Sequence, residues 1–151
     1  MGTRKIDFFC KINLSSALEI GTVDGPTLDW WSRQGDAARS CAFGGGLTSD
    51  TALQELRTFC YARGLSFRVW GNSAAFDLGL LGCAYKALGE LTPWSHKQEA
   101  CYRTLKNLRK DVPAPAFAGV QHHALDDARH QLRHLLALLE AIRPESVADG
   151  P

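Results

Sequence analysis

The chain has 151 residues, of which 45% are hydrophobic and 22% are charged, and its 17 basic and 16 acidic residues give a net charge of +1. This length and composition are typical of one soluble globular domain. A nucleic-acid-binding protein that relies on a broad basic surface is more strongly charged, so any such binding here must depend on a local site.

The cysteines and the apolar segments indicate a cytoplasmic protein. Five cysteines are spread along the chain without a Cys-x-x-Cys pair, which argues against a zinc cage and a complete disulfide framework. Residues 1–19 lack the continuous apolar stretch of a signal peptide. The most apolar helical segment, near the C-terminus, is interrupted by Arg, His and Gln, so we predict no membrane span.

The first third of the chain predicts one strand and one helix. Residues 6–14 are rich in Phe and Ile and predict a strand. Pro26 is well placed as the first residue of a helix that carries Trp30 and Trp31. The glycine run at 44–46 lacks the Lys-Ser/Thr of a phosphate-binding P-loop, and no clear strand precedes it. We interpret it as a flexible connection.

A helix, a strand and a second helix are predicted next. Thr48-Ser49-Asp50 is a capping cluster for a helix that ends at Gly64. Residues 65–70 alternate in polarity and contain aromatic and β-branched side chains, which predicts a buried strand. Gly71-Asn72 then turns the chain into a helix over 74–88.

Asp77 lies in the first turn of the predicted 74–88 helix, close to the edge where the preceding strand ends. Proteins of the α/β class commonly bind ligands at this edge of the sheet. An acid in a first helical turn can also serve only to compensate the helix dipole. The spacing alone does not choose between these two interpretations.

In the C-terminal part, a polar loop is predicted over 90–99, a short strand or strand end over 101–104 and a helical segment over 105–110. A second loop over 113–119 leads into a long helix over 124–142. The predicted buried stripe of the long helix is Leu125, Ala128, Leu132, Leu135, Leu136 and Leu139. Strands that alternate with helices indicate a single α/β layered domain over residues 1–143, followed by a disordered tail over 144–151.

Imidazoles and carboxylates are concentrated at residues 121–128, at the start of the long helix. Such a group can hold a divalent cation and take a proton from water. We expect Asp77, His122 and Asp127 to meet at one metal-dependent site. His123 and Asp126 are interpreted as surface or supporting residues.

One further histidine pair, His130 and His134, lies one helical turn apart in the manner of a metal-binding pair. We interpret this pair as part of a solvated helix face.

Two motifs resemble those of the DEDDh-type 3′-5′ exonucleases, the DnaQ-like superfamily of the polymerase proofreading subunit with a ribonuclease H-like fold. His122-x-Ala124-x-x-Asp127 looks like their third motif, and Asn72-Ser73-x-x-Phe76-Asp77 resembles their second. Four shorter patterns resemble a phage and bacterial exoribonuclease-like branch, namely Trp30-Trp31-x-x-Gln34, Trp70-Gly71-Asn72, Pro93-Trp94 and Arg103-Thr104. The similarity runs from about residue 8 to residue 142.

The resemblance implies a ribonuclease H-like three-layer fold with a mixed sheet and a site with two Mg²⁺ or Mn²⁺ ions. Asp77 and Asp127 would be metal ligands, and His122 would be the general base that deprotonates the attacking water. The substrate would be the 3′ end of a single-stranded RNA or DNA, and the resemblance leaves a homodimer open. The candidates for nucleotide contact are Asn72, Phe76, Trp94 and Arg103, with core or turn packing as the alternative.

The family's first motif, an Asp-x-Glu-Thr on the central strand, is missing from this sequence. Residues 6–14 resemble the family's third strand, so the resemblance implies that the chain starts late and lacks about two strands. We therefore expect weak or no activity, an unpaired edge along 65–70, and marginal stability or association. The alternatives are a catalytically degenerate module that binds nucleic-acid ends, and a structural partner whose missing strands come from another chain.

Overall fold

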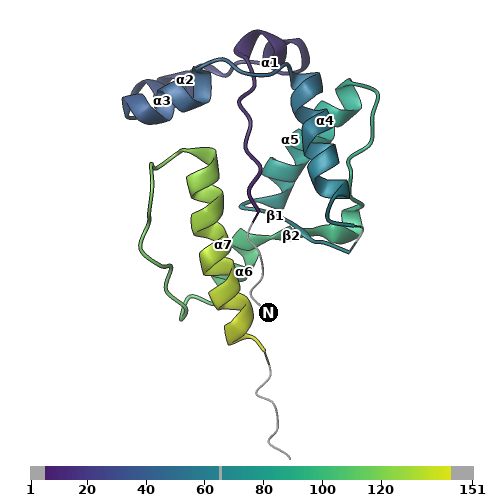
Figure 1. The fold of residues 1–151 in the computed structure, drawn as a ribbon. Coiled ribbons are helices and arrows are strands. Elements are labelled where there is room, and N and C mark those ends of the chain that lie inside the picture. Colours follow the sequence, from purple (N-terminus) through teal and green to yellow (C-terminus); the bar gives the residue numbers. More distant parts are fainter. Residues whose placement is uncertain (1–5, 65, 144–151) are drawn as a thin grey trace, which may run out of the picture.

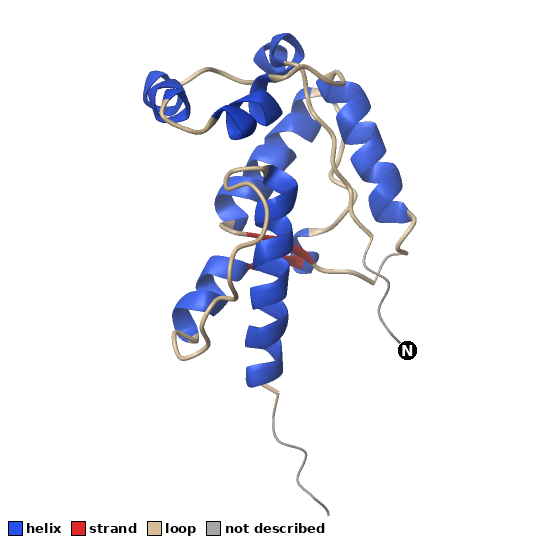
Figure 2. Ribbon diagram, turned by 60° about the vertical axis from the view of Figure 1, so that its left-hand side comes forward, coloured by secondary structure: helices blue, strands red, loops and turns tan. Residues whose placement is uncertain are grey.

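The computed structural model describes residues 6–64 and 66–143, and in this part of the chain a small parallel sheet lies between two groups of helices (Figure 1). The strands β1 (Val69–Gly71) and β2 (Glu99–Cys101) pair in parallel, with Val69 opposite Glu99. Helix α5 (Ala74–Ala87) connects them. Within the described ranges, β1 has no second neighbouring strand. Figure 2 shows the two strands surrounded by helices.

The first core cluster joins α4 (Ser49–Tyr61) and α5 to one face of the sheet. Its buried members are Leu53, Cys60, Leu78, Tyr85 and Trp94. The Tyr85 hydroxyl donates a 2.7 Å hydrogen bond to the Leu53 carbonyl oxygen, so the buried phenol is satisfied. Val69 of β1 packs against this cluster.

The second core cluster joins α6 (Tyr102–Leu108) and α7 (Ala124–Ala141) to the other face. Tyr102, Leu135 and Leu138 are buried there, and Trp70 of β1 packs against them. Val69 and Trp70 contribute to different clusters because successive side chains of a strand point to opposite faces. The predicted α/β architecture is therefore confirmed, with helices on both faces of the sheet.

His134 belongs to the second core, so its assignment to a solvated helix face was wrong. Only 2% of His134 is exposed. Its Nδ1 lies 2.7 Å from the Tyr102 hydroxyl and its Nε2 lies 3.0 Å from the Val112 carbonyl oxygen. A carbonyl only accepts, so the network assigns the ring proton to Nε2 and makes the tyrosine the donor to Nδ1. These two partners allow a polar ring to be buried.

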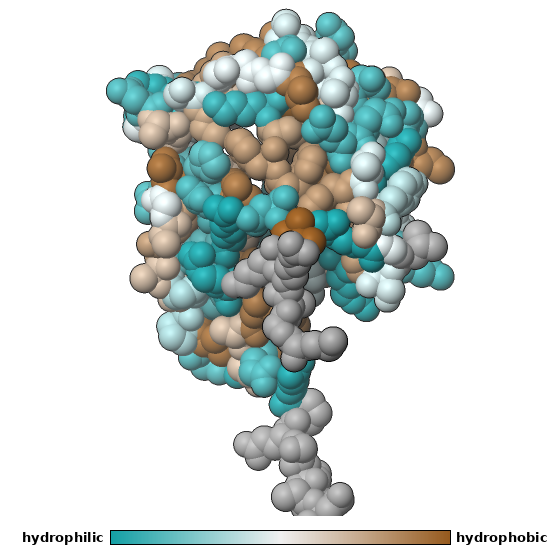
Figure 3. Space-filling view, in the orientation of Figure 1, coloured by the Kyte–Doolittle hydropathy of each residue, from teal (hydrophilic) through white to brown (hydrophobic). Residues whose placement is uncertain are grey.

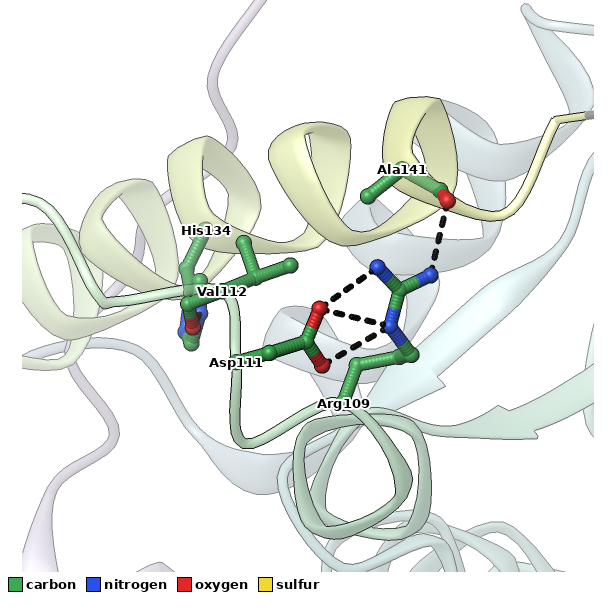
Figure 4. Close-up of polar contacts among 5 residues, drawn as sticks. All are labelled: Arg109, Asp111, Val112, His134 and Ala141. Atoms are coloured by element: carbon green, nitrogen blue, oxygen red, sulfur yellow. Dashed lines mark hydrogen bonds and ion pairs between the residues drawn. The ribbon is translucent and has the colours of Figure 1, made fainter. Parts of the chain in front are cut away.

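The loop after α6 is attached to the end of α7 near this histidine (Figure 4). The Arg109 guanidinium donates to both carboxylate oxygens of Asp111 and, at 2.7 Å, to the carbonyl oxygen of Ala141 in the last turn of α7. A cation at this end of a helix also offsets its dipole. Arg109 holds the pKa of Asp111 below its ordinary value.

The bounds of α7 agree with the predicted helix, but its buried stripe is shifted. Leu135 and Leu138 are buried, whereas Leu132 and Leu136 are 43% and 51% exposed. The reason is that the helix packs against Trp70 and Tyr102, which select the face that carries 134, 135 and 138. Several leucine stripes fit the sequence of this helix, and only the tertiary contact chooses among them.

The predicted strand over 6–14 does not form. The segment is extended, and its single bridge joins Ile12 to Leu47. A segment with strand propensity forms a strand only when a neighbouring strand pairs with it, and the described residues contain no such strand here. The segment runs through the middle of the molecule, and Figure 3 shows apolar surface in this area. Phe9 is 39% exposed and Leu14 is 47% exposed.

Two short helices, α1 (Leu14–Ile20) and α3 (Asp36–Phe43), were not predicted, and they flank the expected helix α2 (Gly25–Ser32). The start of α1 is fixed by Asn13, whose side-chain oxygen accepts the backbone N–H of Ser16 at 2.8 Å. Asp24 caps α2 in the same way through Thr27.

The other differences concern element ends. The strand expected over 65–70 covers only Val69–Gly71, and Leu65 lies outside the described residues. The strand expected over 101–104 ends at Cys101, and α6 begins at Tyr102 after a short 3-10 turn (η1, His96–Gln98) and β2. The predicted disordered tail at 144–151 lies outside the described residues. No described helix has the length and apolarity needed to cross a membrane.

Candidate functional site

The carboxyl ends of β1 and β2 bring two predicted site residues together. Asn72 follows β1 and Arg103 follows β2 by two residues, and the Arg103 backbone N–H donates to the Asn72 carbonyl oxygen at 3.1 Å. Because the strands are parallel, both residues lie at the same edge of the sheet. Phe76, in the first turn of α5, is 65% exposed.

Asp77 joins this edge and also holds its turn in place. Its Oδ2 accepts the backbone N–H of Ser73 at 2.8 Å, which satisfies a donor at the start of α5. Gly71 permits this approach, because a Cβ at position 71 would lie 3.1 Å from both Cβ and Oδ2 of Asp77. The second carboxylate oxygen of Asp77 is not used by this hydrogen bond.

The two neighbouring acids at the start of α7 have different partners. Asp126 is committed to the preceding loop, since its Oδ2 accepts the Val120 backbone N–H at 3.0 Å and it also lies near His123 and Arg129. The carboxylate of Asp127 is half-buried and makes no hydrogen bond or ion pair within residues 6–64 and 66–143. Asp127 is therefore the acid of this pair that is available to a cation.

His122 has an exposed imidazole on an unusual backbone. Its φ is +65°, a left-handed conformation, and its ring meets the Trp30 ring edge-on at 4.9 Å between centroids. The ring borders a cavity of about 370 Å³ whose walls include Phe9, Trp31 and Phe43 and whose polar lining includes Lys11. Aromatic walls with a nearby ammonium group are suited to a base and a phosphate.

The structure does not assemble the predicted metal site as a group of three. Among the described residues, no three His, Cys, Asp or Glu side chains are placed to share a metal ion, so Asp77, His122 and Asp127 do not form such a group. A cavity of about 260 Å³ is lined by residues of β1 and α7, among them Trp70 and Ala128. Asp127 lies on a helix that borders this space, whereas Asp77 lies on α5, which contributes no residue to the lining.

Trp94 is not part of the candidate site. The residue is 6% exposed, its ring lies in the first core cluster, and its indole N–H donates to Glu99 at 3.1 Å. A base has no free face of this ring to stack on. The alternative of core packing applies to Trp94, and the predicted nucleotide contact is corrected for this residue.

Cys101 lies at the same sheet edge and was not singled out from the sequence. It is the last residue of β2, where the first turns of α5 and α6 meet. Hydrogen bonds from the Thr104 hydroxyl and from the backbone N–H groups of Ala74, Thr104 and Arg103 lower the pKa of the Cys101 thiol to about 7. No sequence motif signals this position, because its donors come from two helices that meet only in the fold.

We expect Cys101 to be alkylated by iodoacetamide with a pH midpoint near 7. The thiolate reacts, and the folded state favours it. Burial raises the pKa of Cys10 and Cys60, so these thiols react slowly at neutral pH. The measurement is the rate of label uptake by the Cys101 peptide as a function of pH, by mass spectrometry.

The control for this prediction is Thr104→Val, which removes the strongest donor and moves the midpoint upward. Since the pKa of Cys101 is lower in the folded state than its ordinary 9.0, its contribution to stability is present above pH 9 and is lost as the pH falls through about 7. A midpoint near 9 in the unmodified protein contradicts the assignment.

The fold and the site together define an α/β protein in which a parallel β-α-β unit presents an acid, an amide and a guanidinium-bearing residue at the carboxyl edge of its strands. The family model for the 3′-5′ exoribonuclease Rv2179c-like domain matches residues 2–139. The chain therefore belongs to this family. Searches of curated proteins and of solved structures find no match to the chain.

Proposed function

We propose that the chain removes nucleotides from the 3′ end of single-stranded RNA by metal-dependent hydrolysis. The observation that carries this proposal is the match to a 3′-5′ exoribonuclease family over residues 2–139, a range that contains Asp77, His122 and Asp127. The ribonuclease H-like fold and the DEDDh grouping are part of the same proposal. The family is described as one of exoribonucleases, which favours RNA over DNA, a choice that the sequence motifs leave open.

The proposed roles follow from which side chains are free. The Asp127 carboxylate has no hydrogen-bond or ion-pair partner among the residues that the structure describes, and Asp77 has one carboxylate oxygen that its hydrogen bond to Ser73 does not use. Hard cations such as Mg²⁺ and Mn²⁺ prefer oxygen ligands, and Mg²⁺ is often held by one or two carboxylates together with water and substrate phosphates. When bound, the metal would stabilise charge on the phosphodiester oxygens. The two carboxylates fit such an ion in type, and RNA phosphates would complete its ligands.

His122 is the proposed general base. Its imidazole is exposed beside the aromatic cavity and forms no hydrogen bond within the described part of the chain, so a water molecule can approach a ring nitrogen. We place the terminal base in this cavity, against the ring of Phe9 or Trp31, with Lys11 near a phosphate. Asn72, Phe76 and Arg103 remain proposed contacts at the sheet edge.

A second candidate is a catalytically degenerate module that binds RNA ends without cutting them. Two observations favour it: the described residues contain no three-ligand metal group, and the sequence contains no Asp-x-Glu. The two candidates differ in one measurable property, because only the enzyme releases the terminal nucleotide.

The test is single-turnover digestion of 3′-labelled single-stranded RNA with the protein in excess and Mn²⁺ present. We expect slow release of labelled mononucleotide that EDTA abolishes and that Asp127→Asn lowers by at least about 10–100-fold. Asp126→Asn is the matched control, because its amide oxygen still accepts the Val120 N–H and the rate is retained. RNA that is bound but left intact by the unmodified protein supports the binding module, and equal rates for both variants reject the proposed role of Asp127.

A further inference from the structure

The Trp30-Trp31-x-x-Gln34 pattern lies in the hairpin that α2 and α3 form beside the start of α7 (Figure 1). Its two tryptophans have different surroundings. The Trp30 ring meets the His122 ring edge-on, with 4.9 Å between centroids and an interplanar angle of 80°. The Trp31 side chain borders the aromatic cavity, and its ring meets the Phe43 ring edge-on at 5.5 Å. The pattern therefore joins the wall of the cavity to the proposed general base.

Trp30 has no place in a hydrophobic core. None of the eight described residues of α2 is buried, and Trp30 itself is 40% exposed. Besides His122, its ring contacts only the adjacent Trp31 ring among the aromatic contacts of the described residues, at 5.0 Å between centroids. The indole thus packs against a residue of the candidate site and not against the interior of the protein.

His122 needs an orienting contact, because a general base acts only when a ring nitrogen points at the water. In catalytic triads, a hydrogen bond from a third residue fixes the orientation of the histidine. The His122 ring makes no hydrogen bond within residues 6–64 and 66–143, so the Trp30 ring is the contact that can fix it. An edge-on aromatic contact favours one arrangement by about two- to twelvefold.

Trp30 is itself held in place, as a positioning residue must be. It lies in the last turn of α2, and the Gln34 side-chain amide donates a 2.9 Å hydrogen bond to its carbonyl oxygen. The Arg39 guanidinium of α3 donates to the carbonyl oxygens of Ser32 and Gln34, at 3.0 and 2.7 Å. These bonds satisfy the carbonyl groups at the end of α2 and attach the helix to α3. The hairpin therefore presents the Trp30 ring to His122 from a fixed support.

The cavity separates the tasks of the two tryptophans. In the described part of the chain its lining includes Trp31, Phe43 and Phe9 but not Trp30. A base in this cavity can stack on Trp31 and does not reach the Trp30 ring. A change at Trp31 therefore affects binding, whereas a change at Trp30 acts through the His122 ring.

We propose that Trp30 is a positioning residue whose ring holds the His122 imidazole in the orientation that accepts a proton from water. The inference deepens the proposed function and rests on His122 as the general base. It assigns two tasks to adjacent residues of one motif, because Trp31 binds the terminal base and Trp30 orients the ring that takes the proton.

The first test observes the His122 ring by proton NMR and does not require catalysis. The ring signals are identified by their absence in His122→Asn. In the unmodified protein the ring current of Trp30 displaces them from their positions in the unfolded chain. We expect Trp30→Leu to return them toward those positions and Trp31→Leu to leave them displaced. A displacement that survives Trp30→Leu overturns the proposal.

The second test is single-turnover digestion of 3′-labelled RNA with Mn²⁺ over a range of protein concentrations. Trp30→Leu is expected to lower the saturated rate by about tenfold or more without a change in the half-saturating protein concentration. Trp30→Phe, which keeps an aromatic ring, restores most of the rate. Trp31→Leu is expected to raise the half-saturating concentration by at least about fivefold, since a stacking ring is lost.

The matched control is Leu28→Ala, which removes a 46% exposed apolar side chain from the same helix and retains the rate. Circular dichroism checks that each variant is folded. Equal losses in Leu28→Ala and Trp30→Leu, or a Trp30→Leu variant that changes only the half-saturating concentration, overturn the positioning role. If the unmodified protein releases no nucleotide, the proposed nuclease function fails, and the NMR displacement alone decides whether Trp30 orients His122.

Discussion

Replacing His122 by asparagine is expected to lower the rate of 3′-nucleotide release by about 10²–10⁴-fold, the usual range for loss of a general base. The amide of asparagine cannot take a proton from water at neutral pH. Asparagine is a better replacement than alanine here, because it tolerates the left-handed backbone that His122 adopts at φ +65°. The rate is measured by single-turnover digestion of 3′-labelled RNA with Mn²⁺.

The matched control is His123→Asn. His123 is the N-cap residue of α7 and its ring stacks on Phe9 at 5.0 Å between centroids. Asparagine is favoured at an N-cap, so the helix start is retained. We expect this variant to keep most of the rate, because the proposed base is the neighbouring ring. A rate that is unchanged in His122→Asn, or reduced equally in both variants, shows that His122 is not the base.

The strand, turn and helix around Asp77 could be predicted because their signals are local. The glycine turn after β1 and the glycine after α5 mark the ends of a helix that forms with nearly the expected bounds. The position of Asp77 in the first turn follows from those bounds alone. The parallel pairing of β1 with β2 then follows from the crossover through α5.

The features that were not predicted depend on partners distant in the chain. The burial of His134 requires the Tyr102 hydroxyl, which is 32 residues away, and the pattern of the helix sequence does not show this contact. The 6–14 segment has the composition of a strand, and it stays extended without a ladder because the described residues provide only the Ile12–Leu47 bridge. Local composition predicts what a segment can form, and its neighbours determine what it does form.

The same distinction applies to the candidate site. The motif at residues 122–127 identifies the region, but it does not tell Asp126 from Asp127. The structure does, because Gly119, at φ +111°, lets Asp126 lie against the loop and accept the Val120 N–H. A Cβ at position 119 would lie 2.5 Å from the Asp126 carboxylate. The loop backbone thus binds Asp126, whereas the Asp127 carboxylate has no partner within the described ranges.

Two substitutions at Asp77 are expected to separate its two interpretations, helix capping and metal binding. Asp77→Ala removes the acceptor of the Ser73 N–H and is expected to lower the free energy of unfolding by about 1–2 kcal/mol. Asp77→Asn keeps an acceptor oxygen in place, and its loss is limited to the helix-dipole contribution of at most about 1 kcal/mol. Urea unfolding measures both values.

The activities of these two variants decide between the interpretations. If Asp77 holds a metal ion, both variants lose at least about 10–100-fold in the Mn²⁺-dependent rate, because asparagine lacks the negative charge that a hard cation requires. If the carboxylate serves only the turn, Asp77→Asn retains the rate while Asp77→Ala is merely less stable. The hydrogen bond to Ser73 is present in the asparagine variant and absent in the alanine variant, so the two variants differ in stability but both lack the negative charge. A rate that falls equally in both variants therefore identifies Asp77 as a metal ligand.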